Sequence, residues 1–350
     1  MILTILVALV SLIGLIALHE FGHFILAKKF GTEVEEFGIG YPPRLFGKKF
    51  GETLYSLNLI PFGAFVKIKG EQGGIEDYRS FIGKPMWQRV LIVLGGVVSF
   101  WIIAAIILGI VAGTWGLPTA VSDEENHNLI NPRVQIIRIL PDSPASQAEL
   151  EMGDIIIGFQ KVEETQKFIK SNDGKKIILE IKRGKEIFKK EVIPKEGLIG
   201  VGLTRIALKP CSWYRAPLQG AIATGQLTAN IVGGWILGLK SVLGIAELPE
   251  GVKMELMGPL GIFALLGEYF ELGINYFLFL VALIAVALAL ANILPIPALD
   301  GGKLVFLAIE AIRGRPVNQK IEQNITAFFF VLLIILMIFI TVKFDIPRVF

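Results

Sequence analysis

Hydrophobic side chains dominate four long stretches of the chain, and charged residues gather in the segments between them. The stretches cover residues 1–27, 90–117, 272–299 and 325–342. A helix needs roughly 20 apolar residues to cross the hydrocarbon core of a bilayer, so each stretch is predicted to span it. A fifth stretch, residues 216–239, is uncharged but rich in Gly, Thr, Gln and Asn, which leaves open whether it spans the membrane or lies at its surface.

The polar segments predict how the chain is threaded through the bilayer. Residues 28–89 are rich in Lys and Arg, which favours the cytoplasmic side for this connection and the outside for the N-terminus. The second span then carries residues 122–205 outward as an extracytoplasmic domain. Residues 206–271 are expected to form amphipathic or interfacial helices, and residues 300–324 a cytoplasmic loop before the last span.

The extracytoplasmic segment has the pattern of a small β-rich domain, with strand-like alternation and turn signals. The signals are strands at residues 134–140 and 175–193, a helix start at Ser143-Pro144, a turn at Arg183-Gly184 and a closing strand at residues 197–201. The order strand, short helix, Gly-Asp turn, strand, helix and hairpin resembles a PDZ domain. The alternative is a small β domain that only spaces the membrane helices.

Composition narrows the class of protein. Of the 350 residues, 53% are hydrophobic, which is too many for an ordinary soluble enzyme. The net charge of +3 is small and scattered, so no nucleic-acid partner is expected. Cys211 is the single cysteine, so any metal site has to use His and carboxylate ligands. No Lys or Arg precedes the first stretch, so it is expected to remain as an anchor rather than act as a removable signal peptide.

Candidate chemistry lies inside the first stretch, where the sequence ALHEFGH carries His19, Glu20 and His23. Helix positions i and i+4 share a face, so the two imidazoles can bind one ion while Glu20 acts as a general base. This is the HExxH signature of zinc hydrolases. The alternative is a polar helix face buried in a bundle, but a carboxylate at membrane depth is costly and is usually there for function.

A catalytic zinc site needs a third protein ligand and an open position. Soluble proteases often place that ligand in HExxHxxGxxH, but here Leu26 and Lys29 occupy the last two marked positions. His127 lies in the predicted extracytoplasmic segment, on the wrong side of the membrane. Three acidic residues follow the first stretch in a predicted loop that no regular geometry returns to the histidines: Glu33, Glu35 and Glu36.

Asp300 is the better candidate for the third ligand. It follows the third stretch in NILPIPALDGG, where Pro295 and Pro297 interrupt the helix and expose backbone that only a protein-lined or wet cavity tolerates. The alternative is a helix that ends at Pro295 and leaves Asp300 in a solvated turn.

HEFGH in the first stretch, Asn-x-x-Pro-x-Pro-x-Leu-Asp-Gly-Gly in the third and the PDZ-like insert between them resemble the site-2 protease family, peptidase family M50, of intramembrane zinc metalloproteases. The similarity extends over essentially the whole chain and points to the branch of the regulator of sigma-E protease, which cuts anti-sigma factors. The resemblance implies Zn²⁺ held by His19, His23 and Asp300, with Glu20 activating water. It also implies a substrate channel lined by Asn292, Pro295 and Pro297, and a membrane-associated β loop at residues 53–71.

The residues of this loop support a β hairpin independently. Apolar side chains alternate on both sides of Pro61, and Gly63 follows the proline. An edge strand of such a hairpin can pair with an unwound substrate, so Gly63, Phe65 and Val66 are the predicted substrate contacts. The alternative is an anchoring hairpin without substrate contact. The Gly-rich, basic residues 31–52 are expected as a loop that admits water.

Zinc binding at Asp300 has a consequence for the doubtful stretch at residues 216–239. If that stretch crossed the membrane alone, Asp300 would lie on the opposite face from His23, about 30 Å away. The stretch is therefore predicted to lie along the outer side of the membrane.

Together these patterns predict a polytopic α-helical membrane protein with about four transmembrane helices, a membrane-associated β hairpin and an inserted PDZ-like domain. The resemblance implies a protease of the inner, cytoplasmic membrane that cuts transmembrane segments of partners such as anti-sigma factors or signal-peptide remnants. Its active site would face the cytoplasm. A metal transporter is the first alternative, although the chain shows neither the repeats nor the several midplane ligands expected of one. A non-catalytic PDZ scaffold is the second, and it has no need of Glu20.

Overall fold

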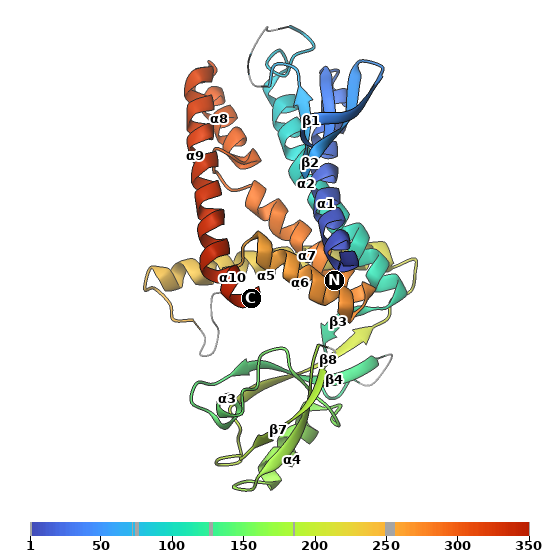
Figure 1. Ribbon diagram of the computed structural model, residues 1–350, viewed down its shortest axis with the longest axis vertical. Coiled ribbons are helices and arrows are strands. Elements are labelled where there is room, and N and C mark those ends of the chain that lie inside the picture. Colours follow the sequence, from blue (N-terminus) through green and yellow to red (C-terminus); the bar gives the residue numbers. More distant parts are fainter. Residues whose placement is uncertain are drawn as a thin grey trace.

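The computed structural model describes residues 2–71, 73, 77–125, 129–184, 186–248 and 256–349, and His127 lies outside these ranges. A bundle of long helices carries a small sheet beside its first helix, and a second, larger sheet lies beyond the opposite end of the bundle (Figure 1). The helices are α1 (Ile2–Lys29), α2 (Met86–Thr114), α3 (Pro144–Gln147), α4 (Val162–Ser171), α5 (Ala216–Val242), α6 (Pro259–Leu272), α7 (Ile274–Asn292), α8 (Asp300–Arg313), α9 (Gln319–Ile340), the π-helical turn η1 (Thr341–Asp345) and α10 (Ile346–Val349). The strands are β1 (Val34–Phe50), β2 (Thr53–Ile68), β3 (Leu117–Ala120), β4 (Ile130–Ile139), β5 (Ile155–Ile156), β6 (Ile177–Arg183), β7 (Glu186–Val192) and β8 (Val201–Lys209).

Five of the described helices are long and apolar enough to cross a membrane: α1, α2, α5, α7 and α9. Four of them coincide with the predicted spans, and α5 is the stretch that the sequence left open. Figure 1 shows α5 and α6 running across the direction of α1 and α9, close to the end of the bundle where the N-terminus lies. This set of helices fits a polytopic membrane protein.

Small residues allow the central helices to approach closely. Gly22 of α1 lies against the backbone of Gly95 in α2, where an added Cβ would collide with the Gly95 carbonyl. On α7, Ala282, Ala285 and Ala289 are fully buried in the core that this helix shares with α2. Without a hydrophobic driving force between helices in lipid, such close backbone packing is what holds a membrane bundle together.

The small sheet differs from the predicted hairpin. Residues 36–39 of β1 lie between two arms of β2, residues 54–57 and 64–67, and pair with both. The prediction that the two sides of Pro61 pair with each other is wrong, because β1 inserts between them. The expected loop at residues 31–52 is also wrong, since most of it is β1.

The bends of the small sheet carry prolines, and its turn is bound to the end of α1. Its bends carry Pro42, Pro43 and Pro61, which have no N–H group to leave unsatisfied in apolar surroundings. At the turn between the strands, hydrogen bonds from Lys28 and Arg79 hold Glu52 and lower the pKa of its carboxyl. The turn is thereby fixed to the end of α1.

The larger sheet has six strands in the order β3-β8-β4-β5-β6-β7. The predicted element order is confirmed: Ser143 caps α3 with Pro144 in its first turn, and β6 and β7 are joined at Arg183. The predicted closing strand at residues 197–201 begins only at Val201. Gly197 and Gly200 have φ of +74° and +78°, so the chain turns there instead of extending.

Candidate metal centre

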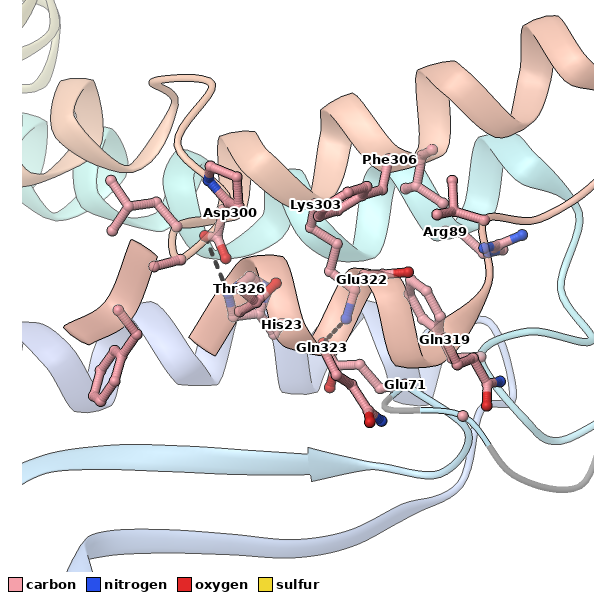
Figure 2. Close-up of a pocket in the computed structure, with 18 of the residues that line it drawn as sticks. His23, Glu71, Arg89, Asp300, Lys303, Phe306, Gln319, Glu322, Gln323 and Thr326 are labelled. Atoms are coloured by element: carbon pink, nitrogen blue, oxygen red, sulfur yellow. Dashed lines mark hydrogen bonds and ion pairs between the residues drawn. The ribbon is translucent and has the colours of Figure 1, made fainter. Parts of the chain in front are cut away.

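His19, His23 and Asp300 converge on one point, although Asp300 is far from the histidines in sequence. The two Nε2 atoms are 3.3 Å apart, and Asp300 Oδ2 lies 3.3 Å from His19 Nε2 and 3.4 Å from His23 Nε2. Figure 2 shows Asp300 facing His23 at one end of a cavity. The three ligand atoms thus form a nearly equilateral triangle.

This triangle fits a tetrahedral ion. An ion bonded to three atoms at about 2.0–2.1 Å with tetrahedral angles separates them by about 3.3–3.4 Å, which is the spacing observed. Two imidazole nitrogens and one carboxylate oxygen are also a donor set that suits zinc and leaves a fourth position for water. The residues present therefore fit Zn²⁺.

The neighbours of the histidines fix how the rings point. His23 Nδ1 lies 2.9 Å from the Ile92 carbonyl oxygen, and donation to that oxygen leaves the Nε2 lone pair directed at the centre. His19 stacks on Phe100 with ring centroids 4.6 Å apart. A Cβ on Gly96 would collide with both imidazoles, so only glycine leaves room for the rings at this point of α2.

A tight turn brings Asp300 to the histidines. Helix α7 ends at Asn292, the prolines interrupt the helix as expected, and α8 starts at Asp300. A Cβ on Gly301 would meet the carbonyls of Ile293 and Leu294, so the turn can fold onto the start of α8 only because this residue is glycine. Residues 300–324, expected as a loop, contain α8, whose Leu307 is buried against α1 and α2.

Glu20 lies beside the ligands and faces the same cavity. Its Oε2 accepts a hydrogen bond of 3.1 Å from the Val66 N–H, so the arm of β2 that follows Pro61 holds the carboxylate in place. The cavity has a volume of about 700 Å³ and extends from Glu20 and Asp300 along α8 to α9. A partly buried carboxylate beside three candidate metal ligands, with an adjoining cavity, is an arrangement suited to a hydrolytic site.

The structure brings some of the predicted substrate contacts to the cavity and leaves others outside. Phe65, Val66 and Pro297 line it, whereas Asn292 and Pro295 are not among the described residues that do so. The Asn292 amide instead donates to the Leu288 carbonyl in its own helix. Gly63 sits at the bend of β2 with φ of +122°, next to the Tyr41 ring that lines the cavity.

The weaker ligand candidates near the first span are engaged elsewhere. Glu33, Glu35 and Glu36 form ion pairs with Lys69, Lys67 and Arg44, respectively. Lys67 and Arg44 belong to the small sheet and Lys69 directly follows it, so all three carboxylates are paired away from the candidate centre.

Sequence reasoning missed the far end of the cavity, which is lined by polar and charged side chains from four segments. Figure 2 shows them along α8, α9 and the adjoining chain: Glu71, Arg89, Lys303, Gln319, Glu322, Gln323 and Thr326. Gln319, Glu322, Gln323 and Thr326 follow the helical spacing i, i+3, i+4 and i+7 at the start of α9, so they share one face of that helix. This polar face on an otherwise apolar helix was the sequence signal that could have revealed them.

Comparisons with known proteins agree with this geometry. The model of peptidase family M50 matches residues 7–336. A Clostridium perfringens protein provisionally named a zinc metalloprotease is 34% identical over 96% of each chain. The zinc metalloprotease RasP of Geobacillus kaustophilus is 25% identical over 94% of each chain, and the chloroplast membrane metalloprotease ARASP of Arabidopsis thaliana is 28% identical over 97% of this chain and 78% of its own. The chain therefore belongs to peptidase family M50, the family of intramembrane zinc metalloproteases that its motifs resemble.

Proposed function

We propose that this protein hydrolyses peptide bonds within or next to the membrane-spanning helix of single-pass membrane proteins. Anti-sigma factors and signal-peptide remnants are the substrate classes that fit best. The proposal rests chiefly on one observation: His19, His23 and Asp300 form a tetrahedral face of ligand atoms 3.3–3.4 Å apart, with Glu20 beside it in a helix that can span the membrane.

The residues divide the chemistry between them. Zinc, held by His19, His23 and Asp300, would polarise the scissile carbonyl and lower the pKa of a water molecule, so that this water loses a proton readily and becomes a nucleophile. Glu20, oriented by the Val66 N–H, takes the proton from that water and delivers it to the leaving nitrogen. The packed surroundings of both histidines keep bulk water away from the ligands.

The edge of the small sheet is a suitable place to hold the substrate. A substrate helix has to unwind before cleavage, because its peptide groups are engaged in helical hydrogen bonds. The Val66 N–H points away from β1 and toward Glu20, so the outer edge of this arm faces the cavity. A substrate strand paired with Gly63, Phe65 and Val66 would therefore run past the base and the metal ligands.

The arrangement of elements supports a topology for the proposed enzyme in the inner membrane. The candidate metal centre lies toward the end of α1 that carries Lys28 and Lys29 in its last turn, which favours the cytoplasmic side. The larger sheet lies at the opposite end of the bundle, where a PDZ-like domain would meet the outer part of substrates (Figure 1). Helices α5 and α6 would lie along the outer membrane surface.

Zinc content and cleavage test the proposal together. Detergent-purified wild type should hold about one zinc per chain and cut a model transmembrane substrate. Glu20→Gln should retain zinc but cut about 10²- to 10⁴-fold more slowly, because it loses the general base. Asp300→Ala should lose zinc. Full zinc in Asp300→Ala would place the third ligand elsewhere, and undiminished cleavage by Glu20→Gln would contradict the role of the base.

A further inference from the structure

The end of the cavity away from the metal centre has more negative than positive side chains. Two ion pairs lie there: Lys303 Nζ is 2.5 Å from Glu71 Oε1, and Arg89 binds both carboxylate oxygens of Glu310 at 2.6 and 2.9 Å. Glu322 of α9 lines the same space without an ion pair to any residue that the structure describes. The described charged residues at this end therefore carry a net charge of about −1, and Glu322 is the carboxylate that lacks a partner.

Both cations are already engaged by other groups. Lys303 and Arg89 lie over the Phe81 ring, at 4.8 and 5.3 Å from its centroid, in addition to their ion pairs. Figure 2 shows Glu322 on the helix that faces Lys303 and Arg89 across the cavity. A cation brought in by a ligand would thus meet Glu322 as the unpaired acid of this region.

The length of the cavity sets how far such a ligand extends from the metal centre. Asp300, Lys303, Phe306 and Glu310 all line it, so one face of α8 follows the cavity for ten residues, or about 15 Å. An extended peptide covers that distance in about four or five residues. A substrate strand that passes the metal centre would therefore reach the charged end within that number of residues.

We infer that Glu322 determines specificity by binding a Lys or Arg of the substrate within about five residues of the cleaved bond, on the cytoplasmic side. This inference rests on the proposed cleavage of membrane-spanning segments. Such segments carry Lys and Arg at their cytoplasmic flank, and a long basic side chain can extend to a carboxylate at the membrane surface. Contact with Glu322 fixes which peptide bond of the unwound segment lies at the metal centre.

The test compares cleavage rates of full-length protein in detergent on model single-pass substrates that carry Lys or Glu at each flank position in turn. Wild type should prefer Lys to Glu by about tenfold at a position within about five residues of the cut, because two partly buried like charges repel. Glu322→Gln should reduce that preference to about twofold or less. Glu322→Lys should reverse it, so that the Glu substrate is cut faster.

Glu35→Gln is the matched control. It also removes one carboxylate, but Glu35 lies in β1, pairs with Lys67 and does not line the cavity, so the wild-type preference should remain. Zinc content and the circular dichroism spectrum check that each variant is folded. A preference in Glu322→Gln and Glu322→Lys equal to that of wild type would overturn the inference, while cleavage itself would still uphold the proposed function. If zinc-loaded wild type cuts none of the substrates, that result would contradict both the proposed function and the inference about Glu322.

Discussion

The two walls of the cavity differ in how tightly their helices are packed. The wall that carries the metal ligands is formed by α1, α2 and the start of α8, and its helices pack through buried residues such as Phe100 and Leu108. The opposite wall is α9, in which none of the described side chains is buried. The wall that holds the candidate ligand atoms is therefore the more tightly packed one, and α9 can move at lower cost.

The packed wall contacts both candidate histidine ligands at Gly96. Gly96→Ala should abolish activity and lower zinc affinity at least about tenfold, because the new Cβ would displace both imidazoles. Zinc retained after dialysis is the measurement.

Gly14→Ala is the control for that substitution. Gly14 lies in α1, and a Cβ added there meets no atom within 4 Å, so zinc retention and cleavage should stay at the wild-type level. Equal zinc retention in the two variants would show that the α1–α2 contact does not set the position of the ligands.

The second test concerns the ion pair that joins α2 to the far end of α8. The side chains of Arg89 and Glu310 are 10% and 17% exposed, so removing one partner leaves a buried charge. Glu310→Leu alone should lower the free energy of unfolding by about 3–5 kcal/mol. Arg89→Met combined with Glu310→Leu should recover most of the loss, because neither member of this ion pair is then left as a buried charge without the other. Thermal unfolding in detergent measures both variants, and a double variant as unstable as the single one would contradict the account.

The metal centre shows what the sequence could and could not reveal. HExxH was readable because the two candidate ligands and the candidate base lie within about one helical turn, where spacing alone fixes geometry. The link to Asp300 spans most of the chain and depends on a turn held by Gly301, so local pattern could suggest it but not establish it. The resemblance to a known family supplied that link.

The pairing of strands in the small sheet was harder to predict from the sequence, for a physical reason. Residues 36–39 pair with two separate arms of β2, and their glycines and flanking charges look like a loop when read locally. In the larger sheet, by contrast, each element is bounded by its own turn or cap, such as Ser143 before α3, and the order of elements was predictable. Local signals therefore predicted local structure, and non-local strand pairing had to come from the fold.

The two walls should also differ in how much an apolar side chain contributes to stability. Leu108 of α2 is fully buried, whereas Ile335 of α9 is 58% exposed, and replacing either by Ala removes the same number of carbon atoms. Leu108→Ala should cost about 2–5 kcal/mol of unfolding free energy, through lost contacts and a cavity. Ile335→Ala should change it by less than about 0.5 kcal/mol. Unfolding titrations in mixed micelles measure both losses. Equal losses would mean that α9 is packed as tightly as α2, and α9 could then not be the more mobile wall of the cavity.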